Sequence, residues 1–141
     1  MRVSAFKKAA AFFAVTVCVV FAGCTPARPY EPPADADVTR LRWNQSLQLV
    51  RIQESDMLAV HLPCLKSKGS DWRLSRAPQS NVLEFIAVRY TGDVKLPCAH
   101  RNEAIFYFAA VAPGLTTFAI DATAPVANAP KAFELAVEVY Y

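Results

Sequence analysis

The stretch AIFYFAAVAPGLTTFAIDA, Ala104 to Ala122, consists of two short apolar runs separated by Pro113 and Gly114. Val, Ile, Phe, Tyr and Thr crowd both runs, and these residue types favour β-strands. A proline followed by a glycine is a common turn sequence. The stretch therefore predicts two strands with a turn between them.

Similar runs occur on both sides of this stretch. SLQLVRIQ and DMLAVHLP are separated by Glu54, Ser55 and Asp56, which predicts a hairpin. WRLS, NVLEFIAVRY and KAFELAVEVYY complete the set, and no window of this part has a convincing helical period. About seven short strands in roughly 100 residues predict an all-β fold, an immunoglobulin-like antiparallel β-sandwich over residues 39–141.

The alternation within these runs also predicts which side chains are buried. In KAFELAVEVYY the apolar residues alternate with Glu134 and Glu138, so the last strand should have one face in water. The expected buried set is Leu49, Leu58, Val60, Leu62, Trp72, Leu74, Phe106, Phe108, Phe118, Ile120, Phe133, Leu135 and Val137. For Trp43, which precedes the first expected strand, a core position and a lid position both remain open.

The N-terminal residues 1–23 have the pattern of a secretory signal peptide. Three basic residues precede an uncharged run from Ala9 to Gly23, which is shorter than the roughly 20 residues of a membrane-spanning helix. A signal peptide is therefore expected rather than a transmembrane anchor. Without residues 1–23, twelve of the fifteen basic residues remain against twelve acidic ones. This neutral balance gives no support for nucleic-acid binding.

The end of this segment, Phe21-Ala22-Gly23-Cys24, resembles the bacterial lipobox. The resemblance implies that Cys24 becomes the lipidated, palmitate-bearing first residue of the mature chain. Thr25 stands where aspartate would imply inner-membrane retention, so an outer-membrane position facing the periplasm is expected, with surface exposure left open. Residues 24–38 contain four prolines and predict an extended tether between lipid and domain.

The expected compartment also predicts the oxidation state of the remaining cysteines. Cys18 leaves with the signal peptide and Cys24 carries lipid, so Cys64 and Cys98 remain. Two remaining cysteines in an oxidising compartment predict one disulfide bond.

Zinc is the alternative for these cysteines. His61-x-x-Cys64 and Cys98-x-His100 would offer two sulfur and two nitrogen ligands. Alternation places His61 on the strand face opposite Leu58, Val60 and Leu62, and ligands fixed on opposed faces do not converge. We therefore expect the disulfide and no metal.

The order of motifs then suggests a family. Ser55-Asp56 stands at the first turn, Leu62-Pro63 ends the second strand, and Gly69 and Trp72 follow at a characteristic spacing. Together with FYFAAVAPGLTTF, Phe106 to Phe118, these features resemble the chagasin-like inhibitors of papain-type cysteine peptidases, which are immunoglobulin-like sandwiches. The resemblance implies reversible steric inhibition by three loops at one end of the sandwich, without catalysis or cofactor.

The loop sequences differ from the family pattern. Leu65-Lys66-Ser67-Lys68 replaces Asn-Pro-Thr-Thr, Ala99-His100-Arg101-Asn102 replaces a glycine-rich loop, and Ala124-Pro125-Val126 keeps only the proline of Arg-Pro-Trp. The residues expected to contact a partner are Leu65, Lys66, Ser67, Lys68, Gly69, Ser70, Ala99, His100, Arg101, Asn102, Ala124, Pro125 and Val126.

The region around these loops is locally basic. The residues concerned are Lys66, Lys68, Arg73, Arg76, Lys95, His100 and Arg101. They are either solvated loop charges or a patch for an acidic protein, anionic lipid or polyanionic glycan.

No catalytic motif is present in the sequence. His100 beside Cys98 could form a catalytic pair, but an oxidising compartment favours a disulfide at that sulfur. We therefore expect no enzyme. Two functions remain open: a peptidase inhibitor, and a structural or assembly component of the envelope that uses the sandwich to bind another envelope protein.

The cysteine analysis gives a first prediction. Intact mass after alkylation without reductant should show no free thiol at Cys64 or Cys98. Replacing both, Cys64→Ser with Cys98→Ser, should lower the free energy of unfolding by about 3 to 4 kcal/mol, because the unfolded chain regains the freedom of a long loop. Stoichiometric zinc in the purified protein would reverse this assignment.

Overall fold

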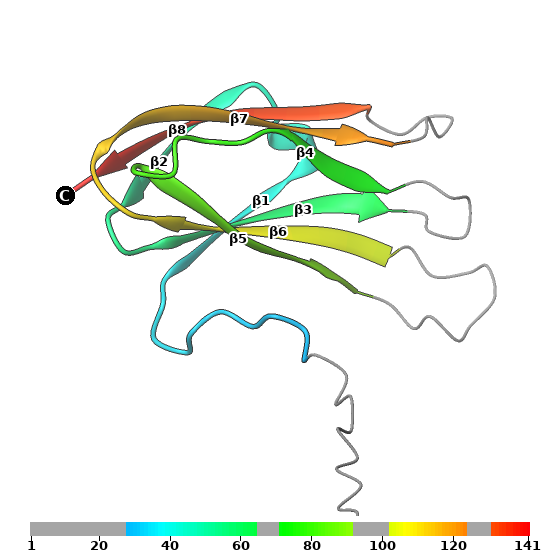
Figure 1. Cartoon of the computed structure of the whole chain (residues 1–141), viewed down its shortest axis with the longest axis horizontal. Coiled ribbons are helices and arrows are strands. Elements are labelled where there is room, and N and C mark those ends of the chain that lie inside the picture. The colour runs from blue at the N-terminus through cyan, green and yellow to red at the C-terminus, as the bar shows by residue number, and fades with distance from the viewer. Residues whose placement is uncertain (1–27, 65–70, 92–101, 124–130) are drawn as a thin grey trace, which may run out of the picture.

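The computed structural model describes residues 28–64, 71–91, 102–123 and 131–141, which form a two-layer β-sandwich (Figure 1). The strands are β1 (Val38–Arg42), β2 (Gln48–Gln53), β3 (Met57–Cys64), β4 (Trp72–Arg76), β5 (Leu83–Tyr90), β6 (Asn102–Ala110), β7 (Gly114–Ala122) and β8 (Ala132–Tyr140), with a 3-10 turn η1 (Trp43–Gln45) after β1. Sheet A has the order β1-β3-β6-β5 and sheet B the order β2-β8-β7-β4. The predicted all-β, immunoglobulin-like sandwich is confirmed. Within the described ranges, no helix has the length and apolar character needed to cross a membrane.

Strand β1 was not predicted, and it changes the expected all-antiparallel pairing. It pairs parallel with β3, and β2 pairs parallel with β8, whereas the remaining ladders are antiparallel. Its sequence VTRLR buries only Leu41 among its five side chains. An edge strand with one buried residue gives too little alternation to be recognised.

The predicted hairpin between SLQLVRIQ and DMLAVHLP is wrong, because β2 and β3 lie in different sheets. The Glu54 amide donates to the Tyr140 carbonyl of sheet B, whereas the next amide, that of Ser55, donates to the Ala110 carbonyl of sheet A. Ser55 has a positive φ of 73°, which turns the chain sharply at this point. These three residues thus form a corner that carries the chain from one sheet to the other.

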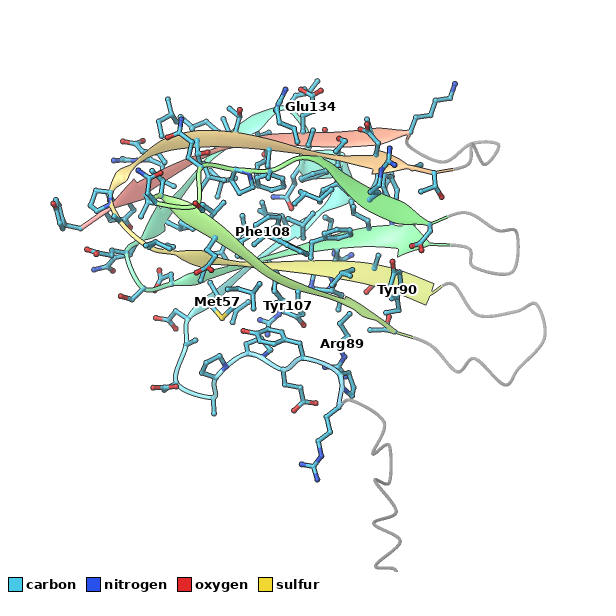
Figure 2. All side chains as sticks on the ribbon, in the orientation of Figure 1. Met57, Arg89, Tyr90, Tyr107, Phe108 and Glu134 are labelled. Atoms are coloured by element: carbon cyan, nitrogen blue, oxygen red, sulfur yellow. The ribbon has the colours of Figure 1, made fainter. Side chains whose placement is uncertain are left out.

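The core between the sheets contains nearly all the residues expected there. Phe108 of sheet A lies between the two sheets (Figure 2), and its ring stacks on the Phe118 ring of sheet B with centroids 4.4 Å apart. Leu74 is partly buried and packs against this cluster. Leu49 is 58% exposed, so its predicted burial is wrong. In β2 the inward positions are Val50 and Ile52, one residue out of phase with the expectation.

The stacked rings supply the second prediction. Phe118→Ala should lower the free energy of unfolding by about 3 to 5 kcal/mol, because it leaves a cavity between the sheets. Leu49→Ala should change it by less than about 0.5 kcal/mol, because that side chain is exposed. Urea denaturation of both variants measures the difference. Equal losses of unfolding free energy in the two variants would show that Leu49, rather than Val50 and Ile52, faces the core.

Candidate binding end of the sandwich

The residues that flank the three expected binding loops lie at one end of the sandwich (Figure 1). Residues 65–70, 92–101 and 124–130 lie outside the described residues, and with them all the proposed contact residues except Asn102. Asn102 begins β6 and pairs with Cys64 at the end of β3. The described structure therefore defines the base from which the three loops extend.

Asp71 connects the bases of all three loops. Its side-chain Oδ1 accepts hydrogen bonds from the Trp72 amide at 2.8 Å and from the Tyr90 hydroxyl at 2.5 Å. Its carbonyl accepts from the Thr123 amide at 2.8 Å, and its own amide donates to the Thr123 hydroxyl at 3.1 Å. Asp71 follows the first loop, Tyr90 precedes the second and Thr123 precedes the third. This single residue therefore fixes the three bases relative to one another.

Trp72 adds a second link between the sheets. Its side chain is 5% exposed, which confirms the predicted core position. The indole Nε1–H donates to the Pro63 carbonyl at 2.9 Å. Pro63 lies in β3 of sheet A and Trp72 begins β4 of sheet B, so this bond joins the two ends of the first loop. The other two loops are closed at their bases by backbone bonds, from Thr91 to Glu103 and from Ala122 to Lys131.

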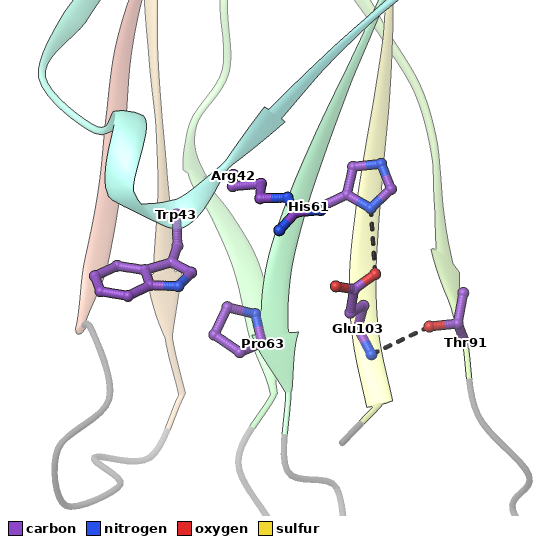
Figure 3. A pocket seen from close by; sticks show the side chains of 6 residues that line it. All are labelled: Arg42, Trp43, His61, Pro63, Thr91 and Glu103. Carbon is purple, nitrogen blue, oxygen red and sulfur yellow. Dashed lines mark hydrogen bonds and ion pairs between the residues drawn. The ribbon is translucent and has the colours of Figure 1, made fainter. Parts of the chain in front are cut away.

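A pocket of about 400 Å³ lies on the outer face of sheet A beside this end (Figure 3). It is lined by Arg42, Trp43, His61, Pro63, Thr91 and Glu103. Trp43 is 49% exposed, so a core position for it is wrong and it lies at the pocket wall. His61 Nδ1 lies 3.3 Å from Glu103 Oε2. The pocket thus combines one aromatic surface with paired polar groups.

His61 lies on the strand face opposite Leu58, Val60 and Leu62, as alternation predicted, and shares its face with Met57 and Ala59. Within the part of the chain that the structure describes, no cluster of three or more His, Cys, Asp or Glu side chains could hold a metal ion. Cys98 and His100 lie outside the described residues. The Cys64–Cys98 disulfide and its zinc alternative therefore stay predictions.

The structure describes two residues of the expected basic patch, Arg73 and Arg76. Arg76 ends β4, away from the loops, and its guanidinium lies 3.8 Å from the Glu134 carboxylate on sheet B. Arg73, next to the first loop, is exposed. The members Lys66, Lys68, Lys95, His100 and Arg101 lie outside the described residues.

Sequence reasoning assigned no role to Asp71, Tyr90 or Thr123. Their hydrogen bonds join residues 19 and 52 positions apart. No local pattern identifies such pairs. The adjacency of Asp71 to the predicted core residue Trp72 was the one available signal, because a polar residue at a strand start often bonds nearby backbone amides.

Solved structures of other proteins share this fold, whereas no family model and no curated protein matches the sequence. The crystal structure of the cysteine protease inhibitor EhICP2 from Entamoeba histolytica superimposes with a TM-score of 0.58 at 11% identity, covering 77% of this chain and 100% of that one. The solution structure of amebosin gives a TM-score of 0.56 at 17% identity, covering 74% and 98%. These likenesses confirm the chagasin-like scaffold.

The role of Asp71 can be measured directly. Asp71→Ala should lower the free energy of unfolding by about 2 to 3 kcal/mol, and Tyr90→Phe by about 1.5 kcal/mol, because both remove hydrogen bonds to a carboxylate. The double variant should lose less than the sum, because the two residues share one bond. Glu84→Ala, at an exposed carboxylate, is the control. Additive losses would show that Asp71 and Tyr90 act independently.

Proposed function

We propose that the sandwich binds a papain-type cysteine peptidase through the three loops at its Asp71 end and inhibits it sterically. The observation that carries this proposal is the hydrogen-bonded frame around Asp71, which holds the bases of three loops together. The same scaffold occurs in EhICP2, which is a cysteine protease inhibitor.

The mechanism requires no chemistry of the protein's own. Residues 65–70 would lie across the peptidase cleft, flanked by residues 99–102 and 124–130. Loops whose bases are fixed before binding lose less conformational entropy on association than loops with free bases. The bonds from Asp71 and from the Trp72 indole would therefore favour affinity without contacting the peptidase.

The proposal places the domain at the periplasmic side of the bacterial outer membrane, anchored through lipid on Cys24. Its support is the signal-like residues 1–23 and the lipobox-like sequence before Cys24. Several acyl chains on one cysteine would hold the protein stably, since each buried methylene contributes about 0.8 kcal/mol.

A structural or assembly role in the envelope is the second candidate. Lys66, Lys68 and Arg101 favour it, because charged loop tips fit a flat acidic surface better than a narrow cleft. Under this alternative the same loop end would bind an acidic envelope protein and leave peptidases active.

Inhibition assays separate the two candidates. We expect the mature protein at micromolar concentration to inhibit at least one member of a papain-type peptidase panel reversibly, with loss of activity that is recovered on dilution. Replacing Lys66 and Lys68 with serine should weaken partner binding while changing stability little, because exposed charges contribute little to folding.

The matched control is Glu138→Gln on the outer face of sheet B, which removes an exposed ion pair with Arg51 and should leave binding unchanged. An unaffected panel, together with capture of an envelope protein that the lysine variant fails to bind, would favour the assembly role. Weaker binding of the Glu138 variant alone would place the interface on sheet B.

A further inference from the structure

Residues 28–37, here called the strap, run along the outer face of sheet A before β1 begins (Figure 1). They form no helix or strand, and Figure 2 shows their side chains beneath Met57 and Tyr107. The proline-rich segment between lipid and domain was expected to be an extended tether. Its described part instead contacts the folded sheet.

The central contact of the strap is an aromatic pair. The Tyr30 ring packs on the Tyr107 ring with centroids 5.1 Å apart and planes tilted by 57°. The Tyr30 hydroxyl donates to Met57 Sδ at 3.6 Å. Tyr107 and Met57 are buried, although their strands present them on the outer face of the sheet. The strap is thus part of what covers these two side chains.

Further contacts fix the strap along its length. Glu31 Oε1 lies 3.6 Å from the Arg89 guanidinium of the edge strand β5. At the other end, the Asp37 carbonyl accepts a hydrogen bond from the Met57 amide at 2.8 Å. Between them, Ala36 packs against the same small apolar cluster as Tyr30. Contacts near both ends of the strap therefore show a docked segment.

From these contacts we infer that the strap belongs to the domain and sets how the domain is presented at the membrane. The inference rests on the proposed lipid at Cys24. With the strap docked, Tyr30 is six residue steps from Cys24, and a chain of that length reaches at most about 20 Å. Without docking, fourteen residues up to Val38 would reach about 50 Å. Docking therefore shortens the greatest distance between the lipidated cysteine and the domain by more than half.

The side on which the strap lies determines the orientation. Because the strap leaves the domain beneath sheet A, a short tether holds the outer face of sheet A toward the membrane and sheet B away from it. The loop end around Asp71 is then presented sideways, along the membrane surface (Figure 1). The partner that fits this arrangement is a protein whose binding surface lies close to the same membrane.

Energy transfer to the membrane tests this orientation. The mature lipoprotein is reconstituted in phosphatidylcholine vesicles that carry an acceptor dye on the headgroups. A donor dye is placed through a genetically encoded azido residue at position 84, exposed on sheet A, or at position 117, exposed on sheet B. We expect higher transfer from position 84 than from position 117.

The strap variant Tyr30→Ser with Glu31→Gln should abolish this difference, because the domain would then rotate on a longer tether. Asp35→Asn, at an exposed strap residue, is the matched control and should keep the difference. Faster hydrogen exchange of residues 28–37 in the strap variant, but not in the control, would support docking independently of lipid.

Equal transfer from positions 84 and 117 in the unaltered protein, or a difference that survives in the strap variant, would overturn the inference. Intact mass of the same preparation reports whether Cys24 carries lipid, and its absence also overturns the inference. Peptidase inhibition is measured in solution and does not depend on the strap. A failed inhibition assay therefore refutes the proposed function without affecting this test.

Discussion

The two sheets of this protein are held together at one end by directional bonds around Asp71. Apolar contacts such as the Phe108–Phe118 stack keep the sheets together but tolerate small shifts between them. The bonds that Asp71 makes to Tyr90 of sheet A, to Trp72 at the start of β4 and to Thr123 after the end of β7 specify a single relative position of the sheets. Every loop at this end begins from that frame, so the geometry of a bound partner would depend on it.

Much of the fold follows from alternation, because strands with one buried face carry the pattern in their sequence. KAFELAVEVYY and AIFYFAAV lie in the middle of their sheets as β8 and β6, and their inward residues were identified correctly. The errors concern the edges. β1 buries only one side chain, so its sequence does not reveal a strand. β2 was recognised as a strand, but it exposes Leu49, so its sequence does not show which side chains face the core. The corner at Ser55 was mistaken for a hairpin because the two differ only in which distant carbonyls they contact.

The candidate site was predictable in position but not in construction. The order of strands placed three connections at one end, and their flanking residues do lie there. The carboxylate that joins them was not predictable, because its partners are brought together only by the packing of the two sheets. Arg76 illustrates the converse. It is close to the first loop in sequence, yet β4 carries it along the outer face of sheet B to a position beside Ala119 of β7, where Glu134 of β8 is its neighbour.

The two outer faces of the sandwich are unequal, and this inequality gives the proline-rich segment a physical role. Sheet A presents Met57, Ile105 and Tyr107 outward, and all three are buried in the folded chain. A polar tether would leave such side chains in water, whereas Tyr30 and Ala36 pack against them. The outer face of sheet B carries the exposed ion pairs of Arg51 and Arg76 and is compatible with solvent. Burial on this face therefore docks the proline-rich segment on sheet A. With the proposed lipid on Cys24, the shortened tether would turn the loop end to lie along the membrane surface.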